Sequence, residues 1–275
     1  MGLNTGLIGK KYTESTYEVT AEAIEKYARA TNDLNERYLG DDVVASPIFC
    51  IVPAFNSFME AAMDPELGAD LLRLVHGQED HLLHTTIGPG DVLTVVPVLE
   101  SVERKDAGET FTVAAGITKA DGTPAAEVRG TMLIRGTGDR RAAAAAASSE
   151  APGSEAVYEE TTKVDEDQTF RYAEASGDNN PIHLDENTAK MAGLPGIILH
   201  GMCTMAIATK GAVDGLAGGD PTRVKRVSVR FSRPVIPGVE LTTRFWAGPS
   251  DEYSFETYNP DGKTVIKNGR VAIGS

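Results

Sequence analysis

Apolar and polar residues follow the same order in the two halves of the chain. Residues 15–19 have the pattern of a short strand, and residues 20–30 repeat apolar side chains at helical spacing behind a capping threonine. An apolar segment through Ala62 is expected to become helical after Pro53, because proline is tolerated in the first turn of a helix. Residues 71–135 are β-rich runs separated by turns that contain Gly and Asp, which predicts an antiparallel sheet.

The second half repeats this order of elements. A strand is expected over residues 158–164, a helix over 167–175, and an apolar helix from Gly201 to about Val213. Four β-rich runs complete the half, and turns that contain Pro and Gly separate them. The runs are 223–235, 240–248, 252–260 and 263–274.

Matching positions support an internal duplication of a strand–helix–sheet unit, and so an α+β fold with two such units. The offset between equivalent residues is 145 early in the repeat and 148 later, which one small insertion explains. Residues 136–155 contain six consecutive alanines followed by Ser, Gly and Pro, which is typical of a linker. We therefore expect domains over 1–135 and 156–275. The matched positions are Tyr27 and Tyr172, Asp33 and Asp178, Asn35 and Asn180, and Pro89-Gly90 and Pro237-Gly238.

Composition excludes some classes of protein. The chain has 275 residues, of which 41% are apolar, and this is enough for a substantial core. A net charge of −14 argues against a nucleic-acid binder, which needs a basic face. The sequence contains no run of about 18 apolar residues, the length that a membrane-spanning helix needs, so no membrane span is predicted. The N-terminus lacks a secretory pattern, and Cys50 and Cys203 lie among apolar neighbours, so we expect a cytoplasmic protein without disulfides.

One cationic block stands out against the acidic composition. It has two interpretations: a solvated strand face, or a patch that meets a phosphate-bearing ligand. The block comprises Arg223, Lys225, Arg226, Arg230 and Arg233.

The candidate chemistry lies in a polar turn of the second half. Asp178 and His183 are five residues apart in an Asn- and Pro-rich segment, and they could together orient and deprotonate a water molecule. Asn180 adds an amide that could order the loop or hold that water. The alternative is an ordinary Asx-rich turn in which the histidine is only a cap.

The duplication supplies an internal comparison for this turn. The first half keeps the acid and the amide as Asp33 and Asn35, but Tyr38 stands at the position of the histidine. The pKa of tyrosine, about 10, is too high for proton transfer near neutral pH. We therefore expect the second copy to be catalytic and the first to be structural or substrate-holding.

The apolar helix that opens at Gly201 could complete the site. The first amides of a helix have no intrahelical partner and lie at the positive end of its dipole, so they can bind a developing oxyanion. Glycine there permits close approach of a ligand to the backbone. The combination suits addition or removal of water next to a carbonyl.

Three sequence features resemble the MaoC-like R-specific enoyl-CoA hydratases. The first is Ser-Gly-Asp-Asn-Asn-Pro-Ile-His-Leu-Asp over 176–185, followed by Gly196 and His200-Gly201-Met202. The second is the strand 227–234, and the third is the Pro-Gly turn that follows it. The resemblance covers most of the second half and, more weakly, a degenerate first half. Leu199 stands where the family usually has alanine, and this departure affects no catalytic residue.

The resemblance implies a double hot-dog fold, in which each unit is a long central helix wrapped by a curved antiparallel sheet. It implies reversible syn hydration of a trans-2-enoyl-CoA to a (3R)-3-hydroxyacyl-CoA. Asp178 and His183 would activate water, Asn180 would support them, and the Gly201 amide would polarise the thioester carbonyl. No metal or redox cofactor is expected, since coenzyme A enters with the substrate. His200, Arg230 and Arg233 would contact that substrate.

The same resemblance implies one active site per chain and a homodimer or a heteromer with a related hot-dog subunit. An acyl-CoA thioesterase and a non-catalytic acyl-CoA-binding subunit are the alternatives. The length of the acyl chain and the direction of the reaction stay open.

The only other cluster of possible metal ligands comprises three histidines of the first half. Alternation along a strand puts His76 and His84 on one face and His81 on the other, which argues against a metal site there.

Overall fold

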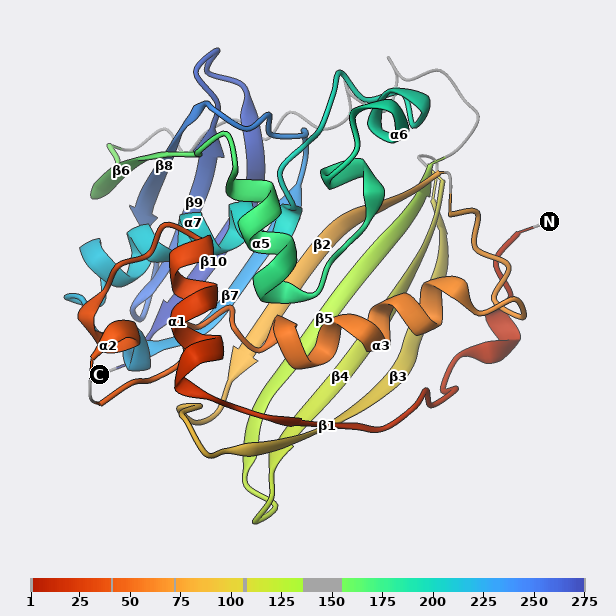
Figure 1. The fold of residues 1–275 in the computed structure, drawn as a ribbon, viewed down its shortest axis with the longest axis horizontal. Helices are drawn as coiled ribbons and strands as arrows, with labels where there is room; N and C mark the ends of the chain where they lie inside the picture. Colours follow the sequence, from red (N-terminus) through yellow and green to blue (C-terminus); the bar gives the residue numbers. More distant parts are fainter. Residues whose placement is uncertain (1, 41, 72, 106–107, 136–154, 275) are drawn as a thin grey trace.

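Ten strands form one antiparallel sheet in the computed structural model, which describes residues 2–40, 42–71, 73–105, 108–135 and 155–274 (Figure 1). Their order across the sheet is β1-β3-β4-β5-β2-β7-β10-β9-β8-β6. The strands of the first half are β1 (Ser15–Glu18), β2 (Leu74–Leu83), β3 (Val92–Lys105), β4 (Gly108–Lys119) and β5 (Pro124–Arg135). Those of the second half are β6 (Tyr158–Lys163), β7 (Val224–Phe231), β8 (Glu240–Ala247), β9 (Glu252–Tyr258) and β10 (Thr264–Ile273).

The strand order contains the predicted duplication. The first half contributes β1-β3-β4-β5-β2 and the second, read from the other edge, contributes β6-β8-β9-β10-β7, so each strand has an equivalent in the other half. Pairing of β2 with β7, from Gln78 opposite Arg230 to Leu82 opposite Arg226, joins the halves at the centre. The predicted α+β class is confirmed. The expected linker lies almost wholly outside the described residues, so the domain limits stay a prediction.

The helices lie on one side of this sheet (Figure 1). Helix α3 (Ile51–Met63) packs on β3, β4 and β5, and helix α7 (Gly201–Gly215) packs on β7, β8 and β10. Helix α3 begins two residues before Pro53, so the expected start was slightly late. No helix among the described residues is long and apolar enough to cross a membrane. The other helices are α1 (Ala21–Ala30), α2 (Glu36–Leu39), α5 (Gln168–Ser176) and α6 (Glu186–Met191).

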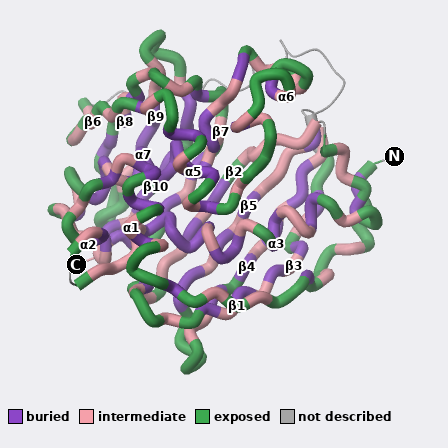
Figure 2. Tube along the Cα trace, viewed as in Figure 1, coloured by how far each residue is buried: buried purple, intermediate pink, exposed green. Residues whose placement is uncertain are grey.

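The core fills the layer between the helices and the sheet (Figure 2). Phe111 on β4, Phe245 on β8 and Phe255 on β9 are all fully buried. Burial of each such side chain contributes about 1.5–3 kcal/mol to stability. The central helix α7 is apolar on nearly all sides, as expected of a helix wrapped by sheet and other helices.

Helices α1 and α5, which precede the two polar turns, meet across the duplication. Thr20 caps α1 by accepting a hydrogen bond from the Ala23 amide at 3.1 Å, as its sequence position predicts. The rings of Tyr27 and Tyr172 lie 5.7 Å apart between the helices. The two equivalent helices therefore hold both polar turns in fixed positions.

Strand β2 differs from the sequence expectation. The sequence predicts separate β-rich runs over 71–77 and 81–88, but residues 74–83 form one strand that carries Gly-Gln-Glu-Asp in its middle. These residues have low β-propensity, yet β5 and β7 pair with the strand on both sides, and this pairing outweighs propensity. A register shift between His76 and Gln78 changes the alternation of side chains.

Gln168 allows a test of the contact between the two halves. Its fully buried side chain donates to the Ala30 carbonyl at 2.7 Å and accepts from the Asp165 amide at 3.0 Å. Because Gln168→Ala leaves both backbone groups without these partners, we expect a loss of about 1–3 kcal/mol in unfolding free energy. Urea unfolding followed by circular dichroism measures this loss.

The control is Glu174→Ala on the same helix, where only an exposed ion pair with Lys26 at 3.6 Å is lost. We expect a change within about 0.5 kcal/mol. Equal stabilities for the two variants would contradict the role assigned to Gln168.

Candidate active site

The loop that carries Asp178 begins where helix α5 ends. Gly177 has φ 80°, a left-handed conformation that glycine adopts without strain and that stops the helix. The Asp178 carboxylate then accepts a hydrogen bond from the Asn180 amide at 3.1 Å, and the Asn180 side chain accepts one from Ile182 N–H at 3.3 Å. Asn180 thereby caps a 3₁₀ turn over Pro181–His183, so its observed contact is with the loop itself.

His183 is buried with one nitrogen committed to the backbone. Its Nδ1 lies 2.8 Å from the Ile198 carbonyl, which can only accept, so Nδ1 carries the proton. Thr169 on α5 donates to the backbone carbonyl of His183 at 2.8 Å and holds the turn. In neutral His183, these contacts leave the lone pair on Nε2 free to accept a proton.

His200 lies directly beside the dyad and is also buried. Its ring stacks on that of His183 with centroids 3.8 Å apart. Its Nε2–H donates to the backbone carbonyl of Asp178 at 3.0 Å, while its Nδ1 lies 3.3 Å from the Thr169 hydroxyl. His200 also precedes α7 as its N-cap, but its side chain makes no capping hydrogen bond. It therefore connects the Asp178 loop to the start of helix α7.

Burial sets the protonation states of these groups. Removal from water raises the pKa of the Asp178 carboxyl, and the nearby His183 and the Asn180 amide partly oppose this shift. Burial lowers the pKa of His183 below its usual value, with Asp178 acting in the opposite direction. Burial, followed by the neighbouring His183, lowers the pKa of His200 strongly. Both imidazoles are therefore neutral at neutral pH.

Asp178, His183 and His200 bring three potential metal-ligand atoms within 4.8 Å of one another. His200 donates Nε2–H to the Asp178 carbonyl and His183 donates Nδ1–H to the Ile198 carbonyl, so each neutral ring keeps one unprotonated nitrogen. Such a nitrogen can accept a proton, and we interpret the group as an acid and a base with a supporting histidine.

Gly201 begins helix α7 next to the dyad. A Cβ atom at this position would lie 3.3 Å from the ring of Phe231, the last residue of β7. Glycine therefore allows the sheet to pack closely against the first turn of the helix. No acidic side chain lies in that turn, so its amides keep their positive electrostatic character.

The equivalent turn in the first half keeps the backbone arrangement without the imidazole. The Asn35 amide donates to the Asp33 carboxylate at 3.3 Å, as the Asn180 amide does to Asp178. Burial raises the pKa of Asp33 to about 7. The Tyr38 hydroxyl is buried and has no hydrogen-bond partner among the described residues. This turn therefore has the acid but no base beside it.

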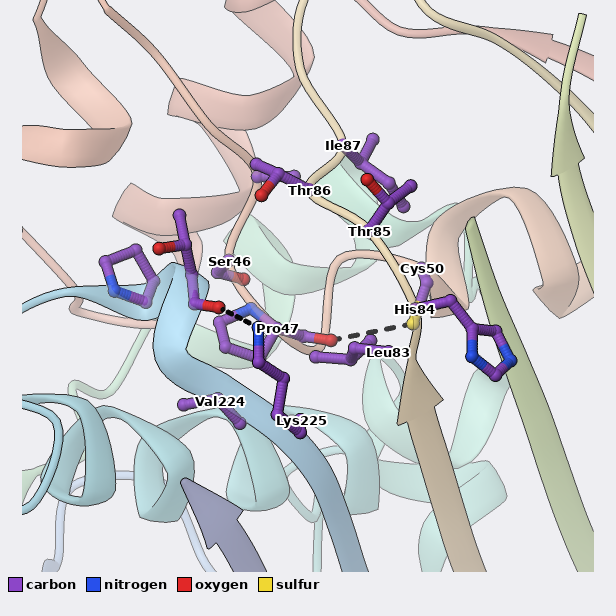
Figure 3. Close-up of a pocket in the computed structure, with 13 residues that line it drawn as sticks. Ser46, Pro47, Cys50, Leu83, His84, Thr85, Thr86, Ile87, Val224 and Lys225 are labelled. Atoms are coloured by element: carbon purple, nitrogen blue, oxygen red, sulfur yellow. Dashed lines mark hydrogen bonds between the residues drawn. The ribbon is translucent and has the colours of Figure 1, made fainter. Parts of the chain in front are cut away.

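A small pocket lies at the start of α3, and its lining includes none of the turn residues Asp33, Asn35 and Tyr38 (Figure 3). It encloses about 40 Å³. That is close to the volume of one water molecule, about 30 Å³ in the liquid, and far too small for an acyl chain. Its lining includes Ser46, Pro47, Cys50, Leu83, Thr85 and Val224.

In the structure, the residues of the cationic block of the second half fall into two groups with different neighbours. Arg223 donates to the backbone carbonyls of Gly274 and Ala217, and Arg226 pairs with Asp80. The exposed Arg230 lies opposite Lys267 in the pairing of β7 with β10, and Arg233 follows β7. Burial, then Arg230 and Arg233, lower the pKa of Lys267, so these three cations lie close together.

Several features of this site could not be read from the sequence. The Ile198 carbonyl, the Thr169 hydroxyl and the ring of Phe231 carry no motif, and only packing brings them to the dyad. The stacking of His200 on His183 is also a tertiary feature.

Two family models together match most of the chain. The model of the MaoC like domain matches residues 147–267, and that of the FAS1-like dehydratase domain region matches residues 6–128. The solved structure of a MaoC-like dehydratase from Phytophthora capsici superposes with a TM-score of 0.86 at 23% identity, covering 99% of this chain and 98% of that chain. A Mycobacterium tuberculosis protein described as having a double hot-dog fold superposes with a TM-score of 0.64 at 12% identity, covering 96% of this chain and 94% of that chain. The chain therefore contains a MaoC-like domain in its second half and a FAS1-like dehydratase region in its first, and it has the predicted double hot-dog fold.

Relatives in sequence carry names of the same class. The 3-hydroxyacyl-thioester dehydratase Y of Mycobacterium tuberculosis is 28% identical over 94% of this chain and 84% of that protein. The peroxisomal enoyl-CoA hydratase 2 of Arabidopsis thaliana is 44% identical over 33% of this chain and 28% of that protein. The mouse peroxisomal multifunctional enzyme type 2 is 27% identical over 95% of this chain, but only 36% of that longer protein is covered.

The protonation states of the two stacked imidazoles can be measured directly. We expect the pKa values of His183 and His200 to lie below the free-histidine value of about 6.5, because burial disfavours the charged ring. Long-range ¹H–¹⁵N NMR from pH 8 to 5 follows both rings, with His183→Gln and His200→Gln to assign the signals. A midpoint above 6.5 for either ring would contradict its neutral state.

Proposed function

We propose that this protein catalyses the reversible syn hydration of a trans-2-enoyl thioester to a (3R)-3-hydroxyacyl thioester. The observation that carries the proposal is neutral His183 with a free lone pair on Nε2. One nitrogen of its ring lies within 4.8 Å of an Asp178 carboxylate oxygen and of His200, the residue before helix α7. The names of the relatives support a hydro-lyase acting on enoyl-CoA or hydroxyacyl thioesters.

Asp178 and His183 perform the proton transfers in this proposal. The dyad holds a water molecule against C3 of the enoyl group and accepts one of its protons as the oxygen attacks. The dyad then returns a proton to C2 on the same face. One water is thereby added, with its hydroxyl on C3 and a hydrogen on C2. Asn180 keeps the loop in place through its contacts with Asp178 and Ile182.

The start of helix α7 stabilises the intermediate. Negative charge develops on the thioester oxygen while C2 is enolate-like, and the Gly201 amide is the donor that we assign to it. The close contact with Phe231 shields this end of the helix from water. His200 holds the backbone of Asp178 through its Nε2–H, and we assign it no proton transfer.

Coenzyme A is the carrier that we propose for the acyl group. Arg230 and Arg233, with Lys267 close by, form a cationic cluster in a protein of net charge −14. Such a cluster suits the phosphates of coenzyme A. The first-half turn has Tyr38 at the position of His183 and so lacks the imidazole, and we propose one active site per chain.

Thioester hydrolysis is not favoured as the alternative. A 12:0-ACP thioesterase from Umbellularia californica superposes with a TM-score of 0.56 at 10% identity, and this shows the fold alone. Cys203, the thiol near the site, points to the Ala30 carbonyl at 3.8 Å, and burial raises its pKa. The thiol therefore stays protonated and cannot act as the nucleophile of a hydrolase.

We also propose a cytoplasmic location and assembly with a second hot-dog chain. The two buried free thiols support a reducing compartment. Resident metal or redox cofactors have no role in the proposed reaction.

Removal of either dyad group tests the proposed function. We expect Asp178→Asn and His183→Ala to lower kcat for crotonyl-CoA by about 10²–10⁴-fold, because each removes a proton-transfer group. Loss of the enoyl-thioester absorbance measures turnover, and a thiol reagent detects hydrolysis. Full activity in both variants, or stoichiometric thiol release by the wild type, would overturn the proposal.

The control for the dyad is Tyr38→Phe in the first half. The Tyr38 hydroxyl has no hydrogen-bond partner among the described residues. Its removal should therefore leave kcat unchanged and the unfolding free energy within about 0.5 kcal/mol of the wild-type value. If all three variants unfold at temperatures similar to that of the wild type, any loss of turnover comes from the missing side-chain group and not from loss of the fold.

The cationic cluster predicts an effect on binding. We expect Arg230→Gln to raise KM for crotonyl-CoA about three- to tenfold at unchanged kcat, since a phosphate contact acts equally in the ground and transition states. Arg244→Gln, which breaks an exposed pair with Glu159, is the matched control. Crotonyl-N-acetylcysteamine has no phosphate and should show no difference between variants. An equal change with both substrates would contradict the assignment.

A further inference from the structure

The hydroxyl of Thr169 makes its hydrogen bond outside its own helix. Threonine in a helix commonly donates to the carbonyl four residues earlier, as Thr209 on α7 does to Met205 at 2.8 Å. Thr169 is fully buried in the first turn of α5, so no carbonyl of that helix lies four residues before it. Its hydroxyl instead crosses to the 3₁₀ turn and donates to the His183 carbonyl at 2.8 Å.

The same hydroxyl also faces the second imidazole. Thr169 Oγ1 lies 3.3 Å from Nδ1 of His200. Because Nε2–H of His200 donates to the Asp178 carbonyl, Nδ1 of this neutral ring is unprotonated and can only accept. The single hydroxyl proton thus has two acceptors, and the shorter contact assigns it to His183. One side chain on α5 therefore touches both residues whose rings stack 3.8 Å apart.

Hydrogen bonds hold His183 at three points, and Thr169 supplies one of them. The His183 amide donates to the Asn180 carbonyl at 3.0 Å within the turn, and Nδ1 donates to the Ile198 carbonyl at 2.8 Å. The third point is the His183 carbonyl, which accepts from Thr169. Loss of the hydroxyl would leave this carbonyl without that partner and let the turn shift. Nε2, the atom that takes the proton, would shift with it.

The duplication shows that the helix itself does not need this hydroxyl. Tyr27 and Tyr172 fix the offset between α1 and α5 at 145 residues, so the equivalent of Thr169 is Ile24. Ile24 is buried in α1 as Thr169 is in α5. An apolar side chain of similar branching therefore fills the same place in the first half.

The first half also replaces both imidazoles. Tyr38 stands at the position of His183, and Cys50 precedes α3 as His200 precedes α7. The hydroxyl therefore occurs only in the half that has the two imidazoles. This links Thr169 to the chemistry of the turn and not to the packing of its helix.

Cys50 belongs to a separate buried network on strand β2. Its Sγ lies 3.2 Å from His81 Nδ1, His81 Nε2 lies 2.9 Å from one oxygen of Glu79, and the other oxygen lies 2.7 Å from His76 Nε2. The expectation that alternation separates His76 from His81 was wrong, because the bulge between His76 and Gln78 lets both rings reach one carboxylate. Burial would lower the pKa of His81, but Cys50 and Glu79 raise it to about 10, so His81 is the cation that pairs with Glu79. The position before α3 thus supports a buried ion pair.

We propose that Thr169 is a positioning residue of the active site, whose hydroxyl fixes the two stacked imidazoles beside Asp178. It holds His183 by the backbone carbonyl, so that Nε2 keeps its place for proton transfer. It also lies against Nδ1 of His200, whose Nε2–H holds the backbone of Asp178. Thr169 acts through these two histidines and not on the substrate. This inference rests on the proposed function and adds helix α5 to the parts that orient the dyad.

Thr169→Val tests the inference, because valine keeps the branched shape but has no hydroxyl. We expect kcat for crotonyl-CoA to fall about ten- to a hundredfold, since a misplacement of about 1 Å has effects of this size. KM should stay within about twofold, because the groups assigned to coenzyme A are untouched. Thr169→Ser keeps the hydroxyl, so its kcat should stay within about threefold of the wild type.

The matched control is Thr209→Val on α7. It also removes a buried hydroxyl that donates to a backbone carbonyl at 2.8 Å, so both valine variants should lose similar thermal stability. Its kcat should equal that of the wild type. If Thr169→Val does not fold, Thr169→Ala removes the same hydroxyl. Wild-type kcat without the Thr169 hydroxyl, an equal loss in Thr209→Val, or the same loss in Thr169→Ser would contradict the inference.

The imidazole signals separate this inference from the proposed function. Long-range ¹H–¹⁵N NMR reports the surroundings of both rings without any turnover. The ring signals of His183 and His200 should move in Thr169→Val and keep their wild-type positions in Thr209→Val. Moved signals support the positioning role even if crotonyl-CoA is not a substrate. Unmoved signals in Thr169→Val refute it even if the wild type is an active hydratase.

Discussion

The pairing of β2 with β7 is the interaction on which the rest of this structure depends. It joins two copies of a helix-and-sheet unit into one sheet, so neither copy has an exposed edge at the centre. It also brings His76 and Phe231, which are 155 residues apart, into contact. A side chain of the first copy therefore packs on the strand that lies beside the start of helix α7 in the second.

Duplication followed by divergence gives the two polar turns different chemistry on one scaffold. Both turns fold the acid back onto an amide two residues later, at Asp33 and at Asp178. Only the second has an imidazole with a free nitrogen, next to the first turn of helix α7. The first has a buried tyrosine in its place.

Burial and hydrogen bonding determine how the working site is charged. His183 is buried and committed to the Ile198 carbonyl through Nδ1, so it is neutral and basic at Nε2. Asp178 is in part desolvated, and a carboxylate there is stable only with donors or a cation nearby. A neutral base, an anion and the positive end of a helix then lie together in a space closed to most solvent. This arrangement favours proton transfer at a carbonyl that becomes enolate-like.

The sequence by itself determined the duplication, the α+β class, the MaoC-like family and the importance of the turn around Asp178, because these depend on local patterns and on a specific motif. It did not determine the single strand β2, since Gly-Gln-Glu-Asp has low β-propensity and only pairing on both sides makes it a strand. It also placed His76 and His81 on opposite faces, because a β-bulge leaves no mark in the alternation of residues. The partners of His183 and the packing of His76 on Phe231 are contacts between distant segments, and only the tertiary structure could decide them.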